Sequence, residues 1–154
     1  MSNLRSAVIK YSKKLNSTNL SPLRSGNISV RAKEENIDGF YITPSGAKYS
    51  SLRPKDISFV SLKGKFDKEK SIPSSEWRFH QDIYVNKKEA KAIVHAHSTC
   101  ATAVSTHQKS IPAFHYMVGV AGGEDIKCTK YATFGTRQLS NNILSALKNR
   151  SACL

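Results

Sequence analysis

The chain has 154 residues, of which 39% are hydrophobic and 23% charged, and its formal net charge at pH 7 is +13. This length and composition are typical of one globular domain that is large enough to bury a core. The chain contains no run of about 18 apolar residues, which excludes a membrane-spanning helix, and residues 1–14 lack the apolar stretch of a secretory signal. We therefore expect a single domain over residues 1–154 with no membrane partner.

The cysteines indicate the redox compartment. Cys100, Cys128 and Cys153 are odd in number, widely spaced and without a C-x-x-C pair. This pattern argues against a disulfide framework and against a zinc ribbon, and it suits a reducing compartment. We expect a cytoplasmic protein.

The positive charge favours contact with anions. The lysines are scattered as singles and pairs, however, and no helix-turn-helix, zinc-finger or RNA-binding signature accompanies them. We therefore expect a solvated basic surface and no specific nucleic-acid partner. The positive electrostatic field of this surface would also favour the binding of a phosphorylated substrate.

In the first half of the chain, apolar side chains spaced along one helical face predict a helix over residues 3–16. Apolar and polar residues then alternate at residues 28–30 and 40–42, which predicts a β-hairpin with its loop at residues 34–39. A short strand at residues 57–62 should follow.

In the second half, the sequence PSSE at residues 73–76 predicts a helix start, with serine hydroxyls ready to cap the helix and the glutamate in its first turn. The apolar residues 92–94 predict a buried strand. Helices are expected at residues 99–107 and 136–148, with a loop or strand at 129–134. Since there is no strict βαβ rhythm, we expect an α/β fold with a mixed sheet covered by helices.

A histidine pair, His95-Ala96-His97, follows the expected strand at residues 92–94. Residues i and i+2 of a strand point to the same face, so both imidazoles can converge on one ion. Catalytic zinc takes three protein ligands and keeps one position open. By itself, the pair is equally consistent with two unrelated structural histidines.

Other residues nearby could carry chemistry. Glu76 could bind zinc or act as a base, or it could be an acid that only favours the start of a helix. Ser74 and Ser75 lie at the expected helix N-terminus, which is a natural anion site. The small-residue loops at residues 25–27 and 43–46 would let backbone amides approach a phosphate, although each alone would usually be only a turn. Together with the histidine pair, these residues form a combination that indicates one functional site.

Six segments, in this order, carry a specific resemblance. They are SGNISVR (25–31), ITPSGAKY (42–49), PSSEWRFH (73–80), VHAHS (94–98), IPAFHYMVGVAGG (111–123) and YATFGTRQLS (131–140). Together they closely resemble the class II aldolase/adducin family, and the resemblance extends over the whole chain. It implies an α/β sandwich with a mostly antiparallel central sheet flanked by helices, assembled as a homotetramer with active sites between subunits.

The resemblance also implies an activity and roles for residues. The activity is zinc-dependent cleavage of a ketose 1-phosphate, similar to L-fuculose 1-phosphate, into dihydroxyacetone phosphate and an aldehyde. His95, His97 and Glu76 resemble the zinc ligands, Glu76 also moving a proton, and Tyr116 resembles a tyrosine that reaches a neighbouring subunit's site. The residues that resemble a phosphate cradle are Asn27, Ser45, Gly46, Ser74 and Ser75.

Two positions depart from the family pattern. Arg24 stands where the family's aldolases have a small hydroxyl residue, and the segment at 149–154 resembles one that continues into a strand bearing a third zinc histidine. We therefore expect a domain that lacks the family's C-terminal part. Three hypotheses follow: a zinc-dependent aldolase, a non-catalytic remnant of a split or degraded gene, and an adducin-like binding module. Glu76 and the histidine pair argue against the last.

Overall fold

A computed structural model describes residues 2–154, apart from the side chains of Ser2 and Arg24. The expectation about the Arg24 side chain therefore lies outside the described residues. No helix within residues 2–154 is both long and apolar enough to cross a membrane.

Four antiparallel strands form the central sheet, in the order β3-β2-β1-β4. Their bounds are β1 Asn27–Glu34, β2 Ile37–Ile42, β3 Ser58–Ser61 and β4 Ala92–His95. The antiparallel sheet implied by the resemblance is confirmed, whereas the mixed sheet expected from the order of elements is wrong. The hairpin is confirmed with a shorter loop, because Glu35 and Asn36 adopt positive φ values of 47° and 65° and close a two-residue turn.

Residues 2–154 also form five α-helices and three single-turn 3₁₀ helices. The α-helices are α1 Ser2–Ser17, α2 Trp77–Asn86, α3 Thr99–Thr106, α4 Met117–Val120 and α5 Arg137–Ala146; the 3₁₀ helices are η1 Pro22–Arg24, η2 Tyr49–Ser51 and η3 Pro54–Asp56. The helices expected at residues 3–16, 99–107 and 136–148 are confirmed. The short α4 was not predicted, because four residues give no readable helical period.

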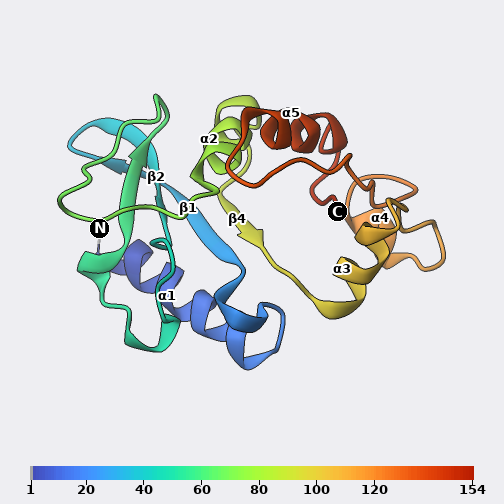
Figure 1. Cartoon of the computed structure of the whole chain (residues 1–154). Coiled ribbons are helices and arrows are strands. Elements are labelled where there is room, and N and C mark those ends of the chain that lie inside the picture. Colours follow the sequence, from blue (N-terminus) through green and yellow to red (C-terminus); the bar gives the residue numbers. More distant parts are fainter. Residues whose placement is uncertain (1) are drawn as a thin grey trace.

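Helices cover both faces of the sheet, with α1 on one side and α2 on the other (Figure 1). Alternation along β2 sends Tyr41 toward the α1 side and Phe40 toward the α2 side. Tyr84 of α2 packs against Phe40, with ring centroids 5.1 Å apart. The helix α5 then packs against α2 through a third apolar cluster that includes Phe79, Ile83, Ile143 and Leu147.

Strand β4 differs from its prediction in burial. It forms as expected, but Val94 is 58% exposed and Ala92 is also exposed. Within residues 2–154, β4 is hydrogen-bonded to a neighbouring strand, β1, on one side only. The apolar sequence identified a strand correctly, but burial depends on what packs over it.

The start of α2 also differs from its prediction. The helix begins at Trp77, and Glu76 is its N-cap residue, with no side-chain capping hydrogen bond. Ser74 N donates to Thr43 O at 3.0 Å, which ties this segment to the end of β2 instead. Residues 74–76 therefore form a loop beside the end of β2, and this loop places the Glu76 side chain.

Replacing Arg31 of β1 with Met should destabilise the fold, because its guanidinium donates to Tyr84 O (2.8 Å), Lys87 O (3.0 Å) and Ala90 O (2.8 Å) at and beyond the end of α2. Met keeps an aliphatic stem but removes the guanidinium donor from all three carbonyls, of which Lys87 O still accepts from the Ala90 N–H. We expect a loss of about 3 kcal/mol in the free energy of unfolding. Urea denaturation measures it, with the exposed Lys33→Met on the same strand as the control. Equal losses in the two variants would contradict this role of Arg31.

Candidate active site

Three side chains from separate elements meet where β1 and β4 pair. Asn27 at the start of β1 lies opposite His95 at the end of β4, and Glu76 reaches them from the loop before α2. Glu76 Oε2 is 2.8 Å from His95 Nδ1 and 2.8 Å from Asn27 Nδ2. The structure therefore brings together two of the expected metal ligands, although 19 positions separate them in the sequence.

The close approach at this point requires a glycine. A Cβ on Gly26 would lie 2.5 Å from the His95 carbonyl oxygen and 2.1 Å from Ser21 Oγ. Real Cβ atoms are essentially never found so close to other atoms, so the contact between β1 and the His95 backbone depends on a residue without a side chain.

His97 joins the same cluster. Its ring centroid is 4.6 Å from that of His95, as the i, i+2 spacing predicts. Its backbone N–H donates to Leu20 O at 2.8 Å, which fixes the chain after β4. His97 Nε2 is buried and has no hydrogen-bond partner within the described residues. A buried, unpartnered imidazole nitrogen beside a carboxylate fits a metal ligand.

The donor set suits a metal ion, since two imidazoles and one carboxylate are the ligands that catalytic zinc commonly takes. Among residues 2–154, no three His, Cys, Asp or Glu side chains are already arranged as a metal site. Glu76 and His95 are instead hydrogen-bonded to each other. Metal binding would therefore replace this hydrogen bond with coordination, and would give His97 Nε2 a partner.

The protonation states also suit metal binding. Burial acts to raise the pKa of Glu76, but hydrogen bonds from His95 and Asn27 outweigh it, so that the pKa of this carboxyl is lowered. Burial lowers the pKa of His97, and the neighbouring His95 acts in the same direction. An ionised carboxylate and a neutral imidazole are the forms that bind a metal.

A small cavity of about 90 Å³ adjoins Glu76. Its lining includes all five residues that the sequence assigned to phosphate, namely Asn27, Ser45, Gly46, Ser74 and Ser75. The three small-residue loops therefore converge, and Gly46 adopts a φ of +63°, which favours glycine. Asn27 differs from the other four residues, because both ends of its side-chain amide already bond to protein groups, Glu76 and His80. Phosphate binding by these residues remains a prediction.

Tyr116 lies apart from this cluster. It is 79% exposed, just before α4, and its ring packs against His115 with centroids 4.4 Å apart. Among the described residues, it is not one of those that line the cavity beside Glu76. Its expected role in a neighbouring subunit's site remains a prediction.

His80 also belongs to this cluster, which the sequence had not predicted. This residue is fully buried, and its Nε2 bonds to the Asn27 side-chain oxygen. Its i, i+4 spacing from Glu76 could have indicated this, because residues four apart lie on one face of a helix and Glu76 is the N-cap residue of α2.

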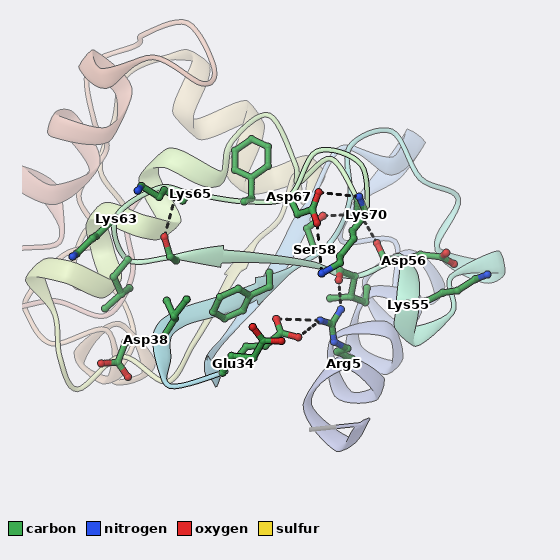
Figure 2. Close-up of a pocket in the computed structure, with 18 of the residues that line it drawn as sticks. Arg5, Glu34, Asp38, Lys55, Asp56, Ser58, Lys63, Lys65, Asp67 and Lys70 are labelled. Carbon is green, nitrogen blue, oxygen red and sulfur yellow. Dashed lines mark hydrogen bonds and ion pairs between the residues drawn. The ribbon is translucent and has the colours of Figure 1, made fainter.

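A wider cavity of about 1380 Å³ lies elsewhere, against β2, β3 and the start of α1 (Figure 2). Its lining is rich in charged side chains, several of which pair with each other, as do Arg5 with Glu34 (3.0 Å) and Lys70 with Asp67 (3.5 Å). Neither Glu76 nor the histidine pair lines it. The volume of a cavity alone therefore does not indicate where Glu76 and the histidine pair lie.

An antiparallel sheet between helices, with a histidine pair and a carboxylate at the ends of its strands, is the arrangement that the resemblance to class II aldolases implied. Comparison with known proteins supports this class. Residues 6–154 match the family model described as Class II Aldolase and Adducin N-terminal domain. The chain belongs to the class II aldolase and adducin family.

Individual relatives agree with this assignment. The chain is 50% identical over 129 residues to L-fuculose phosphate aldolase of Escherichia coli, covering 84% of this chain and 58% of the relative. It is 44% identical over 151 residues to 5-methylthioribulose-1-phosphate/5-deoxyribulose-1-phosphate aldolase of Rhodospirillum rubrum, covering 98% of this chain and 66% of the relative. A solved structure of L-fuculose 1-phosphate aldolase superposes with a TM-score of 0.91 at 37% identity, covering 100% of this chain and 71% of that one. The chain thus spans less than two thirds of both curated relatives.

Proposed function

We propose that this chain carries the metal-binding, proton-transfer and phosphate-binding residues of a zinc-dependent class II aldolase, a lyase. One observation carries the proposal: Glu76 lies at the junction of two sites. On one side it bonds to His95, next to the unpartnered Nε2 of His97, and on the other it lines the cavity formed by the small-residue loops. A base that adjoins both a metal site and an anion site is what cleavage of a phosphorylated ketose needs.

His95, His97 and Glu76 would hold the zinc ion, which as a Lewis acid would polarise the carbonyl of the ketose. In the cleavage direction, Tyr116 of a neighbouring copy would take the proton of the 4-hydroxyl as the bond between carbons 3 and 4 breaks and the aldehyde forms, and a proton would pass on through solvent to the ionised Glu76. Glu76 then returns a proton to carbon 3, which becomes the hydroxymethyl carbon of dihydroxyacetone phosphate. In the synthetic direction the same carboxylate removes that proton.

In the synthetic direction, Tyr116 would act as an acid on the aldehyde oxygen. Tyr116 is exposed and does not line the cavity beside Glu76 of its own chain, which favours a role in the active site of a neighbouring copy in a homotetramer. Ser45, Gly46, Ser74 and Ser75 would hold the substrate phosphate through hydroxyl groups and backbone amides.

We further propose a ketose 1-phosphate similar to L-fuculose 1-phosphate as the substrate. The names of the two relatives differ in the sugar but share a phosphorylated ketose. The test is release of dihydroxyacetone phosphate by the zinc-loaded protein from L-fuculose 1-phosphate, 5-deoxyribulose 1-phosphate and 5-methylthioribulose 1-phosphate. Zinc binding without release from any of the three would contradict an aldolase and would favour the non-catalytic alternatives.

The double variant Ser74→Ala/Ser75→Ala should raise KM for a phosphorylated ketose far more than for its unphosphorylated analogue. Each lost contact from a hydroxyl to a charged group is worth roughly 1.5–3 kcal/mol, which corresponds to a KM increase of about tenfold or more. Steady-state kinetics on both substrates measures the difference, with the exposed Ser17→Ala as the control. Equal losses on the two substrates would show that these serines only shape the loop before α2.

A further inference from the structure

A continuous row of buried hydrogen bonds leads away from Glu76 into the core. Tyr84 Oη lies 2.8 Å from Ser29 Oγ, which lies 2.7 Å from His80 Nδ1. On its other side, His80 Nε2 bonds to Asn27 Oδ1 at 2.5 Å. Asn27 Nδ2 then donates to Glu76 Oε2 at 2.8 Å.

The chemistry of the groups gives this row one direction. An ionised Glu76 can only accept, so Asn27 presents its NH₂ to the carboxylate and its oxygen to His80. That oxygen also only accepts, and His80 must therefore carry its proton on Nε2. The bare Nδ1 then accepts from the Ser29 hydroxyl, whose oxygen accepts from Tyr84. Reversing any one member would set two acceptors or two donors against each other.

The hydrogen-bonded row from Tyr84 to Glu76 is buried, and aromatic rings pack against its central residue, His80. His80 and Ser29 are 0% exposed, Tyr84 is 1% exposed and Asn27 is 3% exposed. The His80 ring stacks on Phe79, with centroids 4.5 Å apart, and on Phe40, at 6.4 Å. Burial lowers the pKa of His80 well below its ordinary value, and the nearby His95 acts in the same direction, so the ring stays neutral. In such a buried environment of low dielectric constant, an unpaired polar group raises the free energy of the folded state, and each hydrogen bond strongly orients its partner.

We propose that His80 is a positioning residue for Glu76, acting through the Asn27 amide. By donating from Nε2, His80 prevents the Asn27 amide from rotating, and the fixed NH₂ then holds one carboxylate oxygen in place. The other oxygen is left for the metal and for the proton of the substrate. This inference rests on the proposed role of Glu76 as base, and it assigns the Asn27 side chain to Glu76 instead of to the phosphate.

Two replacements of His80 separate positioning from packing. His80→Gln puts an amide N–H near the position of Nε2 and can still donate to Asn27. His80→Phe keeps an aromatic ring against Phe79 and Phe40 but leaves Asn27 Oδ1 without its donor. The exposed His107→Phe, at the end of α3, controls for the loss of a histidine elsewhere.

In the zinc-loaded protein, His80→Phe should lower kcat for ketose 1-phosphate cleavage by about 10–100-fold, the usual effect of losing an outer-shell partner, while KM changes little. His80→Gln should recover most of that loss. Equal kcat in the parent protein and in His80→Phe would overturn the proposal, as would a loss in His80→Phe that His80→Gln does not recover while both variants melt like the parent protein.

A second measurement needs no activity. In the metal-free protein labelled uniformly with ¹⁵N, NMR should show His80 as the Nε2–H tautomer, with a proton that exchanges slowly with solvent. The side-chain NH₂ of Asn27 should be equally protected, and should lose this protection in His80→Phe but not in His80→Gln. An Nδ1–H tautomer, or an Asn27 amide unaffected by the Phe variant, would overturn the positioning role. If these signals appear in a protein that cleaves no ketose phosphate, the proposed function fails and the positioning of the Glu76 side chain stands.

Discussion

Glu76→Gln is expected to stop the exchange of solvent deuterium into dihydroxyacetone phosphate while leaving the fold intact. The Gln side chain has the same shape, and its amide oxygen can still accept from Asn27 Nδ2, which lies 2.8 Å from Glu76 Oε2. An amide cannot take a proton from carbon, however, and loss of a positioned base typically lowers a rate by about 10²–10⁴-fold.

Deuterium incorporation followed by proton NMR measures this effect without requiring the full cleavage reaction. The matched control is Glu89→Gln, because Glu89 is an exposed carboxylate just beyond the end of α2. We expect parental exchange from the control and parental melting temperatures from both variants. Undiminished exchange in Glu76→Gln would remove Glu76 from the mechanism, and a parent protein that binds zinc but shows no exchange would count against the aldolase itself.

Removal of either imidazole of the pair should have a comparably large effect on metal binding. We expect His95→Ala and His97→Ala each to weaken zinc binding by more than about 100-fold, because losing even a group outside the coordination shell costs about 10–100-fold. His97→Ala is the cleaner of the two variants. His97 Nε2 has no hydrogen-bond partner to lose within the described structure, whereas His95 also bonds to Glu76.

Calorimetric titration of the metal-free proteins with zinc gives the affinities, and melting curves with and without zinc give an independent check. The metal-free His97→Ala should melt close to the parent protein, but it should lose the stabilisation that zinc confers by binding to the folded state. His107→Ala, which removes an exposed histidine, is the control. Parental zinc affinity in both His95→Ala and His97→Ala would place the metal elsewhere in the chain.

Local patterns in the sequence were sufficient to predict most elements and part of the site. Helical spacing in the first 17 residues predicted α1, and alternation around residues 28–30 and 40–42 predicted the hairpin, because both periods follow from the geometry of a single helix or strand. The i, i+2 spacing also predicted that His95 and His97 would lie together, as their centroid distance of 4.6 Å confirms. The ordered motifs identified the family.

The tertiary structure alone decided three further features. Residues 92–94 read as a buried strand, yet Val94 is 58% exposed, because burial is set by the elements that pack over a strand and not by its own composition. The loop before α2 is tied to Thr43 through the Ser74 N–H, and the Glu76 side chain bonds to His95 instead of capping the helix. Most of all, Asn27 and His80 are 53 residues apart and carry no common local pattern. The sheet and α2 bring them into one hydrogen-bonded row, since the pairing of distant residues depends on how whole elements pack.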